Sequence, residues 1–145
     1  MAKLIVKLSI GIILLLVIFL VVLELFQMSH RPAIVKVVED YERALCEFRK
    51  EDALACCTED GVLVRNGREI PFSSPEFYQA VSKHEHDIQT EIQFDNFDIG
   101  NDEAEMDVVF TSTSSATKQK GKPIACKITM KRIEQAWKIA KIEEK

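Results

Sequence analysis

The sequence predicts an α+β protein: an N-terminal transmembrane helix, then one domain of three helices packed on a curved, mainly antiparallel sheet. Residues 8–23 carry no charge and are almost all aliphatic, although 29% of the 145 residues are charged. Apolar residues then recur at helical spacing as far as His86, and they alternate with polar residues after it. We therefore expect an anchor with a short juxtamembrane segment, residues 1–31, and a single-core domain, residues 32–145.

Residues 4–26 have the length of a membrane-spanning helix. A helix of this length rises roughly 34 Å, and a hydrocarbon core is about 30 Å thick. Lys7 and Glu24 stand near its two ends, where both can reach the membrane interface. A cleaved signal is the alternative, but Gln27-Met28-Ser29 lacks the small-residue pattern that precedes cleavage. We expect an uncleaved signal anchor that contacts membrane lipid through residues 4–26.

The charges near this segment favour a cytoplasmic N-terminus and an extracytoplasmic domain. Lys3 and Lys7 precede the segment together with the amino terminus, and this excess of basic residues marks the cytoplasmic side. The chain has no second long apolar run, which predicts a single-pass membrane protein. Residues 27–145 carry 17 Lys and Arg and 22 Asp and Glu, and this acidic balance argues against a nucleic-acid partner.

The first helix of the domain is expected to begin at Pro32, because a proline at the first helical position loses no hydrogen bond. An apolar stripe follows over four turns, at Ile34, Val37, Val38, Tyr41, Leu45 and Phe48. The opposite, solvent-facing side is expected to hold Glu39, Asp40, Glu42, Arg43, Glu47 and Arg49.

Two short helices and a hairpin are expected next. The second helix contains Ala53, Leu54 and Cys57 and ends at Gly61. A hairpin then turns at Asn66-Gly67, between a strand at 62–64 and a return strand with Ile70 and Phe72. Ser73 or Ser74 caps the third helix, and Ser73 with Glu76 fits a capping box. The buried stripe of that helix is expected at Phe77, Tyr78, Val81 and His84.

The rest of the chain predicts four consecutive antiparallel strands. The alternation changes phase between Phe94 and Phe97, which predicts a β-bulge that bends the strand. Turns are expected at residues 120–123 and 134–135. The alternating inward positions are Ile88, Thr90, Ile92, Phe94, Ala104, Met106, Val108, Phe110, Ile124, Cys126, Ile128, Met130, Trp137, Ile139 and Ile142.

This order of elements resembles the nuclear-transport-factor-2-like superfamily, which includes ketosteroid isomerases and SnoaL-like proteins. The resemblance covers residues 32–145. It is carried by Tyr41-Glu42-Arg43-Ala44-Leu45, Glu51-Asp52-Ala53-Leu54, Thr58-Glu59-Asp60-Gly61-Val62 and Ala136-Trp137-Lys138-Ile139. It implies a cone-shaped domain with an apolar pocket between the sheet and the helices. We expect the pocket to be lined by Tyr41, Leu45, Phe72, Phe77, Phe94, Phe110 and Trp137. The last five of these residues are expected to fill most of the pocket with their aromatic rings.

The resemblance places Tyr41 at the position of the tyrosine that donates to the oxyanion in ketosteroid isomerases. The position of the catalytic base falls at about Arg65, and a guanidinium stays protonated and cannot abstract a proton. We find no counterpart to the protonated aspartate deep in the family's sheet. The candidate catalytic residues are therefore limited to Tyr41, His84 and His86.

Neither the histidines nor the cysteines form a metal-binding pattern. His84 and His86 would lie about 200° apart on a helix, so we expect helix-end histidines, with a role as pocket acid–base groups as the alternative. The four cysteines, Cys46, Cys56, Cys57 and Cys126, contain no C-x-x-C pair. Buried free thiols are the favoured interpretation and one disulfide is the alternative. No metal and no cofactor is predicted.

Three functions are compatible with this sequence. The favoured one is a membrane-anchored, non-catalytic domain for protein interaction or self-association, as a homodimer or with a protein partner, through the outer sheet face. The second is binding of a small apolar ligand, which needs an open apolar cavity. The third is an isomerase, cyclase or dehydratase, which needs a carboxylate or imidazole in the cone near Tyr41.

Overall fold

The computed structural model describes the backbone of residues 2–145 and the side chains of residues 8–145. The chain separates into two compact units, Met1–Pro32 and Ala33–Lys145. Helix α1 (Ala2–Cys46) contributes residues to both. We call the second unit the domain.

The first unit is one apolar helical segment. From Leu8 to Leu25 its aliphatic side chains are exposed, each by at least 43%. By length and composition this part of α1 is suitable to cross a membrane. Residues 4–7, which begin the predicted span, lie outside the described side chains.

Pro32 lies inside α1, so the predicted helix start at this residue is wrong. The residues before it are already helical. Ser29 Oγ donates to the Phe26 carbonyl at 2.8 Å, and the rings of Phe26 and His30, one turn apart, lie 4.4 Å from each other. A proline removes one helical hydrogen bond, but the sequence preceding it contains no other residue that ends a helix.

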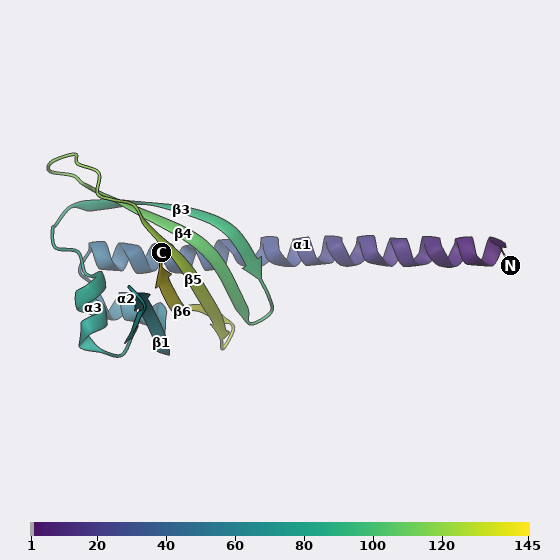
Figure 1. The fold of residues 1–145 in the computed structure, drawn as a ribbon, viewed down its shortest axis with the longest axis horizontal. Coiled ribbons are helices and arrows are strands. Elements are labelled where there is room, and N and C mark those ends of the chain that lie inside the picture. The colour runs from purple at the N-terminus through teal and green to yellow at the C-terminus, as the bar shows by residue number, and fades with distance from the viewer. Residues whose placement is uncertain (1) are drawn as a thin grey trace. The chain divides into compact units, whose positions relative to one another are not determined.

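The domain contains a six-stranded sheet in the order β2-β1-β6-β5-β4-β3. β1 and β6 are parallel, and every other neighbouring pair is antiparallel. This confirms the predicted α+β class with a mainly antiparallel sheet. Figure 1 shows β3, β4 and β5 as long strands that bend in the same direction. The strands are β1 (Cys57–Arg65), β2 (Arg68–Pro71), β3 (Ile88–Ile99), β4 (Glu103–Ser114), β5 (Ile124–Ile133) and β6 (Ala136–Glu144).

The core is formed by the inner face of the sheet and the predicted stripe of α1. Ile34, Val38, Tyr41 and Leu45 are each at most 3% exposed. The inner-face residues Met106, Val108, Ile128, Met130 and Ile139 are at most 1% exposed. Phe48 does not belong to this stripe and is 40% exposed, because α1 ends at Cys46 and Phe48 has a φ of 57°.

The second helix is shorter than predicted. α2 spans Lys50–Ala55, and Cys57 begins β1. Gly61 therefore lies within a strand instead of ending a helix. A Cβ at Gly61 would lie 2.4 Å from the Phe72 ring and 2.7 Å from the Ala140 carbonyl oxygen. The glycine is required by this close packing between β1, β6 and Phe72.

Helix α3 (Pro75–Val81) is capped by Ser74, whose Oγ accepts a hydrogen bond from the Phe77 N–H at 3.3 Å. The predicted capping box from Ser73 to Glu76 is wrong, because Glu76 pairs with Arg68 at 3.0 Å instead. The helix ends at Val81, so His84 lies beyond it and is not part of its stripe.

The predicted bulge and the turns predicted at 66–67 and 134–135 are confirmed. The turn predicted at 120–123 is wrong, because Lys120 pairs with Thr113 in an isolated bridge and the chain turns at residues 115–117 instead. Asn66 and Gly67 have φ values of 54° and 75°, which join β1 to β2 in the two-residue turn that suits a twisted hairpin. Glu134 and Gln135 join β5 to β6 in the same way, with φ values of 50° and 66°. The β3–β4 register shifts between Asp95 and Asp98, around Asn96 with a φ of 51°.

We expect Gly61→Ala to destabilise the domain, because the added methyl group overlaps the Phe72 ring and the Ala140 carbonyl. The expected loss is about 1–3 kcal/mol in the free energy of unfolding. Thermal unfolding followed by circular dichroism measures it. Gly11→Ala is the matched control, since no atom lies within 4 Å of a Cβ at that position. Equal unfolding midpoints for the two variants would contradict the prediction.

Candidate functional site

A cavity of about 510 Å³ lies within the domain, between the sheet and the helices. The prediction that aromatic side chains fill the cone is wrong. Tyr41, Leu45 and Phe110 line the cavity, whereas Phe72, Phe77, Phe94 and Trp137 are not among its lining residues. Phe72 and Phe77 pack on each other with their ring centroids 4.5 Å apart, and Phe94 stacks with Phe97 at 6.1 Å.

The cavity has an apolar interior and a polar rim. Leu45, Leu63 and Ile142 contribute to the interior, from α1, β1 and β6. Two connecting segments supply the rim: the α3–β3 connection through residues 82–85, and the β4–β5 connection through Thr117, Gln119, Lys120 and Gly121. The Thr117–Gly121 residues are exposed, so the cavity meets solvent at the rim.

Tyr41 lines the cavity from α1 and is 3% exposed. Burial raises the pKa of its hydroxyl well above the ordinary value, and the neighbouring Cys57 and Glu42 act in the same direction. The group therefore stays protonated at neutral pH. It can donate a hydrogen bond into the cavity but cannot serve as a base there.

Glu42 is a buried carboxylate on the cavity wall, and its predicted place on the solvent face of the helix is wrong. The residue is 4% exposed and its Oε1 lies 2.5 Å from Lys83 Nζ. Thr90 Oγ1 donates to the same oxygen at 2.8 Å. β3 and the α3–β3 connection cover this side of α1, which the apolar pattern of the helix alone does not reveal.

A sequence signal for Glu42 does exist. Ile34, Val38 and Glu42 follow one another at intervals of four residues, so they lie on one ridge of the helix. Ile34 and Val38 are completely buried. A charged residue that continues a buried ridge is a candidate for a buried ion pair.

A second ion pair, between Arg65 and Glu144, forms another part of the cavity wall. Arg65 Nε and Nη2 donate to the two carboxylate oxygens of Glu144 at 2.7 and 2.6 Å, and Nη1 donates to the Ala80 carbonyl at 2.9 Å. The hydrogen bonds that Arg65 donates to the Glu144 carboxylate raise the pKa of Arg65. Arg65, which the resemblance places at the position of the catalytic base, is thus a tightly paired cation.

The two candidate histidines lie apart from the cavity interior. Both are exposed residues of the α3–β3 connection, and neither belongs to a helix end as predicted. His84 lines the cavity at its rim, and the ring of His86 lies 4.7 Å from that of Phe48. Among the described residues, no group of three His, Cys, Asp or Glu side chains is arranged to hold a metal ion.

All four cysteines are free thiols. Cys57 and Cys126 are buried, and burial raises the pKa of each to about 12. Burial also raises the pKa of the half-buried Cys46 and Cys56. Thiols with raised pKa values are poor nucleophiles, so this environment does not activate any of the four.

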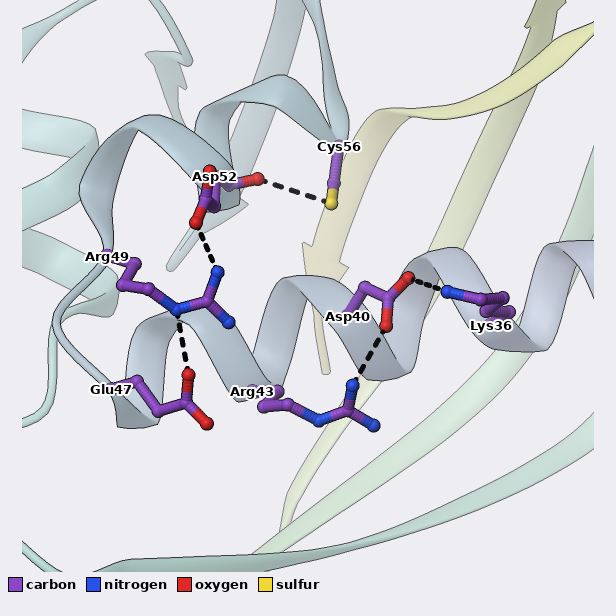
Figure 2. A network of polar contacts seen from close by, with 7 residues as sticks. All are labelled: Lys36, Asp40, Arg43, Glu47, Arg49, Asp52 and Cys56. Atoms are coloured by element: carbon purple, nitrogen blue, oxygen red, sulfur yellow. Dashed lines mark hydrogen bonds and ion pairs between the residues drawn. The ribbon is translucent and has the colours of Figure 1, made fainter.

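Figure 2 shows a different polar cluster, on the exterior of the domain, around the junction of α1 and α2. Arg49 Nε donates to Glu47 at 2.7 Å and the same guanidinium pairs with Asp52, while Asp40 pairs with Lys36 and Arg43. Arg49, Glu47 and Asp52 are about half exposed. Solvent-exposed ion pairs of this kind add little to stability, and we assign no site to this cluster.

The outer face of the sheet is polar. Its cross-strand and neighbouring pairs include Lys127–Glu105 at 3.5 Å, Lys141–Glu143 at 2.8 Å and Lys145–Asp107 at 2.6 Å. Among the described residues of the domain, the exposed large apolar side chains are Phe48, Ile124 and Ile133. These three do not form an apolar patch across the outer face, because Ile124 lines the cavity and Phe48 follows α1.

No protein-family model matches this chain, and no curated protein sequence matches it. Solved structures do. A protein of unknown function with a cystatin-like fold from Nostoc punctiforme aligns with a TM-score of 0.68 at 18% identity, over 79% of this chain and 90% of its own. An NTF-2 like protein of unknown function from Shewanella oneidensis aligns with a TM-score of 0.62 at 12% identity, over 79% and 97%.

The association domain of CaMKII from C. elegans is also similar. It aligns with a TM-score of 0.65 at 15% identity, over 81% of this chain and 96% of its own. These likenesses establish the nuclear-transport-factor-2-like fold, as the sequence predicted. At such low identities they do not establish an activity.

We expect the two buried thiols to make the domain less stable at alkaline pH. Their pKa values rise from 9.0 to about 12 on folding, so the folded state retains protons that the unfolded state releases. The contribution of each protonated thiol to the stability of the folded state is complete below pH 9. This contribution is lost as the pH rises toward 12. At about pH 10.5 the expected loss is about 2 kcal/mol per thiol.

Denaturant unfolding of the wild type and of C57A and C126A, at about pH 7.5 and about pH 10.5, measures this effect. Each substitution should reduce the difference between the two pH values, whatever it does to stability at neutral pH. A pH dependence that both variants leave unchanged would refute the assignment.

Proposed function

We propose that this protein is a membrane-tethered, non-catalytic domain that binds a small, mainly apolar molecule in its cone cavity. The observation that carries the proposal is the cavity of about 510 Å³. Ligand pockets typically measure about 300–1,000 Å³ and combine apolar walls with a few fixed polar groups. Here Leu45, Leu63 and Ile142 supply apolar surface, and Tyr41 supplies a protonated hydroxyl.

The state of the ionisable groups supports binding over catalysis. A general base must be available to accept a proton from the substrate. Glu42 is paired with Lys83, and Glu144 is paired with Arg65. His84 and His86 are exposed, while Tyr41 is buried. An isomerase, cyclase or dehydratase that combines Tyr41 with a histidine is therefore a weaker proposal than a ligand-binding domain.

Self-association through the outer sheet face is the second candidate. The related fold of the CaMKII association domain from C. elegans is the observation that favours it. The outer face of this chain carries charged pairs, and stable homodimer interfaces are usually more apolar. We therefore place self-association, as a homodimer or with a protein partner, after ligand binding.

We propose that residues 4–26 form an uncleaved anchor, with the N-terminus in the cytoplasm and the domain outside. The exposed aliphatic side chains from Leu8 to Leu25 support it, because a helix that is apolar on every side is suited to a lipid environment. Lys3 and Lys7 support the orientation.

Filling the cavity should weaken ligand binding. Ser112 lines the cavity from β4, so Ser112→Phe places a ring in the ligand's space. We expect it to weaken the binding of 2-phenylethanol by about tenfold or more, since the ring and the ligand exclude each other. Isothermal titration of the full chain in lipid nanodiscs, with empty nanodiscs subtracted, measures the affinity.

Thr111→Phe is the matched control, because Thr111 is the neighbouring residue on the same strand and faces the other side of the sheet. It should bind 2-phenylethanol as the wild type does. Equal weakening by both substitutions, or no binding to the wild type, would refute the cavity as the binding site.

The anchor makes a separate prediction. The full chain should stay in the membrane fraction after washing with alkaline carbonate, because a spanning helix is held by its apolar contact with lipid. Protease added outside sealed cells should remove the domain. Release of a soluble form whose mass lacks the first 29 residues would show a cleaved signal instead.

A further inference from the structure

The Glu42–Lys83 pair joins a buried anion on a helix to a cation on a connecting segment. Glu42 belongs to helix α1 and its side chain is 5% exposed. Lys83 belongs to the connection between α3 and β3, has neither helical nor strand structure, and is 16% exposed. Its long aliphatic stem lets the ammonium group reach water from a partly buried position.

Hydrogen bonds hold the carboxylate independently of Lys83. Thr90 Oγ1 donates to Glu42 Oε1 at 2.8 Å, and the Cys46 thiol donates to the same atom at 3.8 Å. Thr90 Oγ1 lies 3.2 Å from Ser112 Oγ, so β3 and β4 fix the donor in turn. The acceptor is therefore already positioned on the cavity wall before a ligand arrives.

The charge of a bound ligand decides which partner of the pair would have to leave. A ligand cation takes the place of Lys83, and Lys83 then moves to solvent at the rim. A ligand anion that engages Lys83 would leave Glu42 buried without a counter-ion, which is strongly unfavourable. The Arg65–Glu144 pair offers no comparable exchange, because both carboxylate oxygens and the Ala80 carbonyl already hold the guanidinium.

We propose that the cavity selects a small apolar molecule that carries an ammonium group, and that Glu42 becomes the counter-ion of this group when Lys83 withdraws. The inference rests on the proposed ligand-binding function and specifies the chemical class of the ligand. Lys83 is then the cation that pairs with Glu42 before a ligand binds, and it lies on the part of the rim formed by the α3–β3 connection.

Three probes of similar size test the proposal: 2-phenylethylamine, 2-phenylethanol and 3-phenylpropionate. Isothermal titration uses the full chain in phosphatidylcholine nanodiscs at neutral pH, where the amine is protonated and the lipid carries no net charge. The amine should bind about tenfold more tightly than the alcohol, and the carboxylate should bind more weakly than the alcohol.

Substitutions at the pair should change this order. Glu42→Gln keeps an oxygen that can accept from Thr90 but removes the charge, so the preference for the amine over the alcohol should disappear. Lys83→Met removes the competing cation, so the amine should bind about tenfold more tightly than it binds the wild type. Glu91→Gln is the matched control, because Glu91 follows Thr90 on β3, is exposed and does not line the cavity; it should preserve the order of the three probes.

The double substitution E42Q/K83M leaves no unpaired charge, so it keeps the test valid if K83M alone unfolds. It should bind the alcohol and show no preference for the amine. Equal binding of amine and alcohol by the wild type would overturn the inference and leave the ligand-binding function standing. Failure of all three probes to bind would overturn both.

Discussion

The inner face of the sheet extends beyond the large apolar side chains that pack against it. The rest of the domain depends on this difference. Along β4 the inward residues are first Ala104, Met106 and Val108, all nearly inaccessible to solvent. Beyond Phe110 they become Ser112 and Ser114, which are too small and polar to fill the same layer. One end of the sheet is therefore a packed core, and the other end lines a cavity. The bends in β3, β4 and β5 let a single sheet serve both purposes (Figure 1).

This arrangement explains why the ionisable groups of the domain interior occur in pairs. A wall that is removed from bulk water cannot hold isolated charges, because the cost of desolvation is too high. Glu42 with Lys83 and Arg65 with Glu144 satisfy this requirement in different ways. The first pair connects a helix to a connecting segment, and the second ties β1 to β6 and, through the Ala80 carbonyl, to α3. The two pairs thus differ in rigidity although both neutralise charge.

Local patterns in the sequence predicted the local structure. The alternation after His86 predicted the four long strands, and Asn66-Gly67 and the phase change near Phe97 predicted a hairpin and a bulge that are present. Pro32 and Gly61 misled the prediction of helix ends, because each is tolerated or required by neighbours that the local pattern does not show. The cavity and the burial of Glu42 depend on contacts between distant segments, such as Glu42 with Thr90. No periodicity within a single element contains that information.

The strand order also has a consequence for how the protein is made. β6 lies between β1 and β5, so the last strand in the chain joins the two halves of the sheet. Parallel pairing of β1 with β6 brings together segments that are separated by most of the domain. Translation delivers residues 136–144 after every other element of the sheet, and the sheet cannot close until they leave the ribosome. Residues 8–25 are synthesised before every strand of the sheet, so this apolar segment is present while the domain is still an open chain.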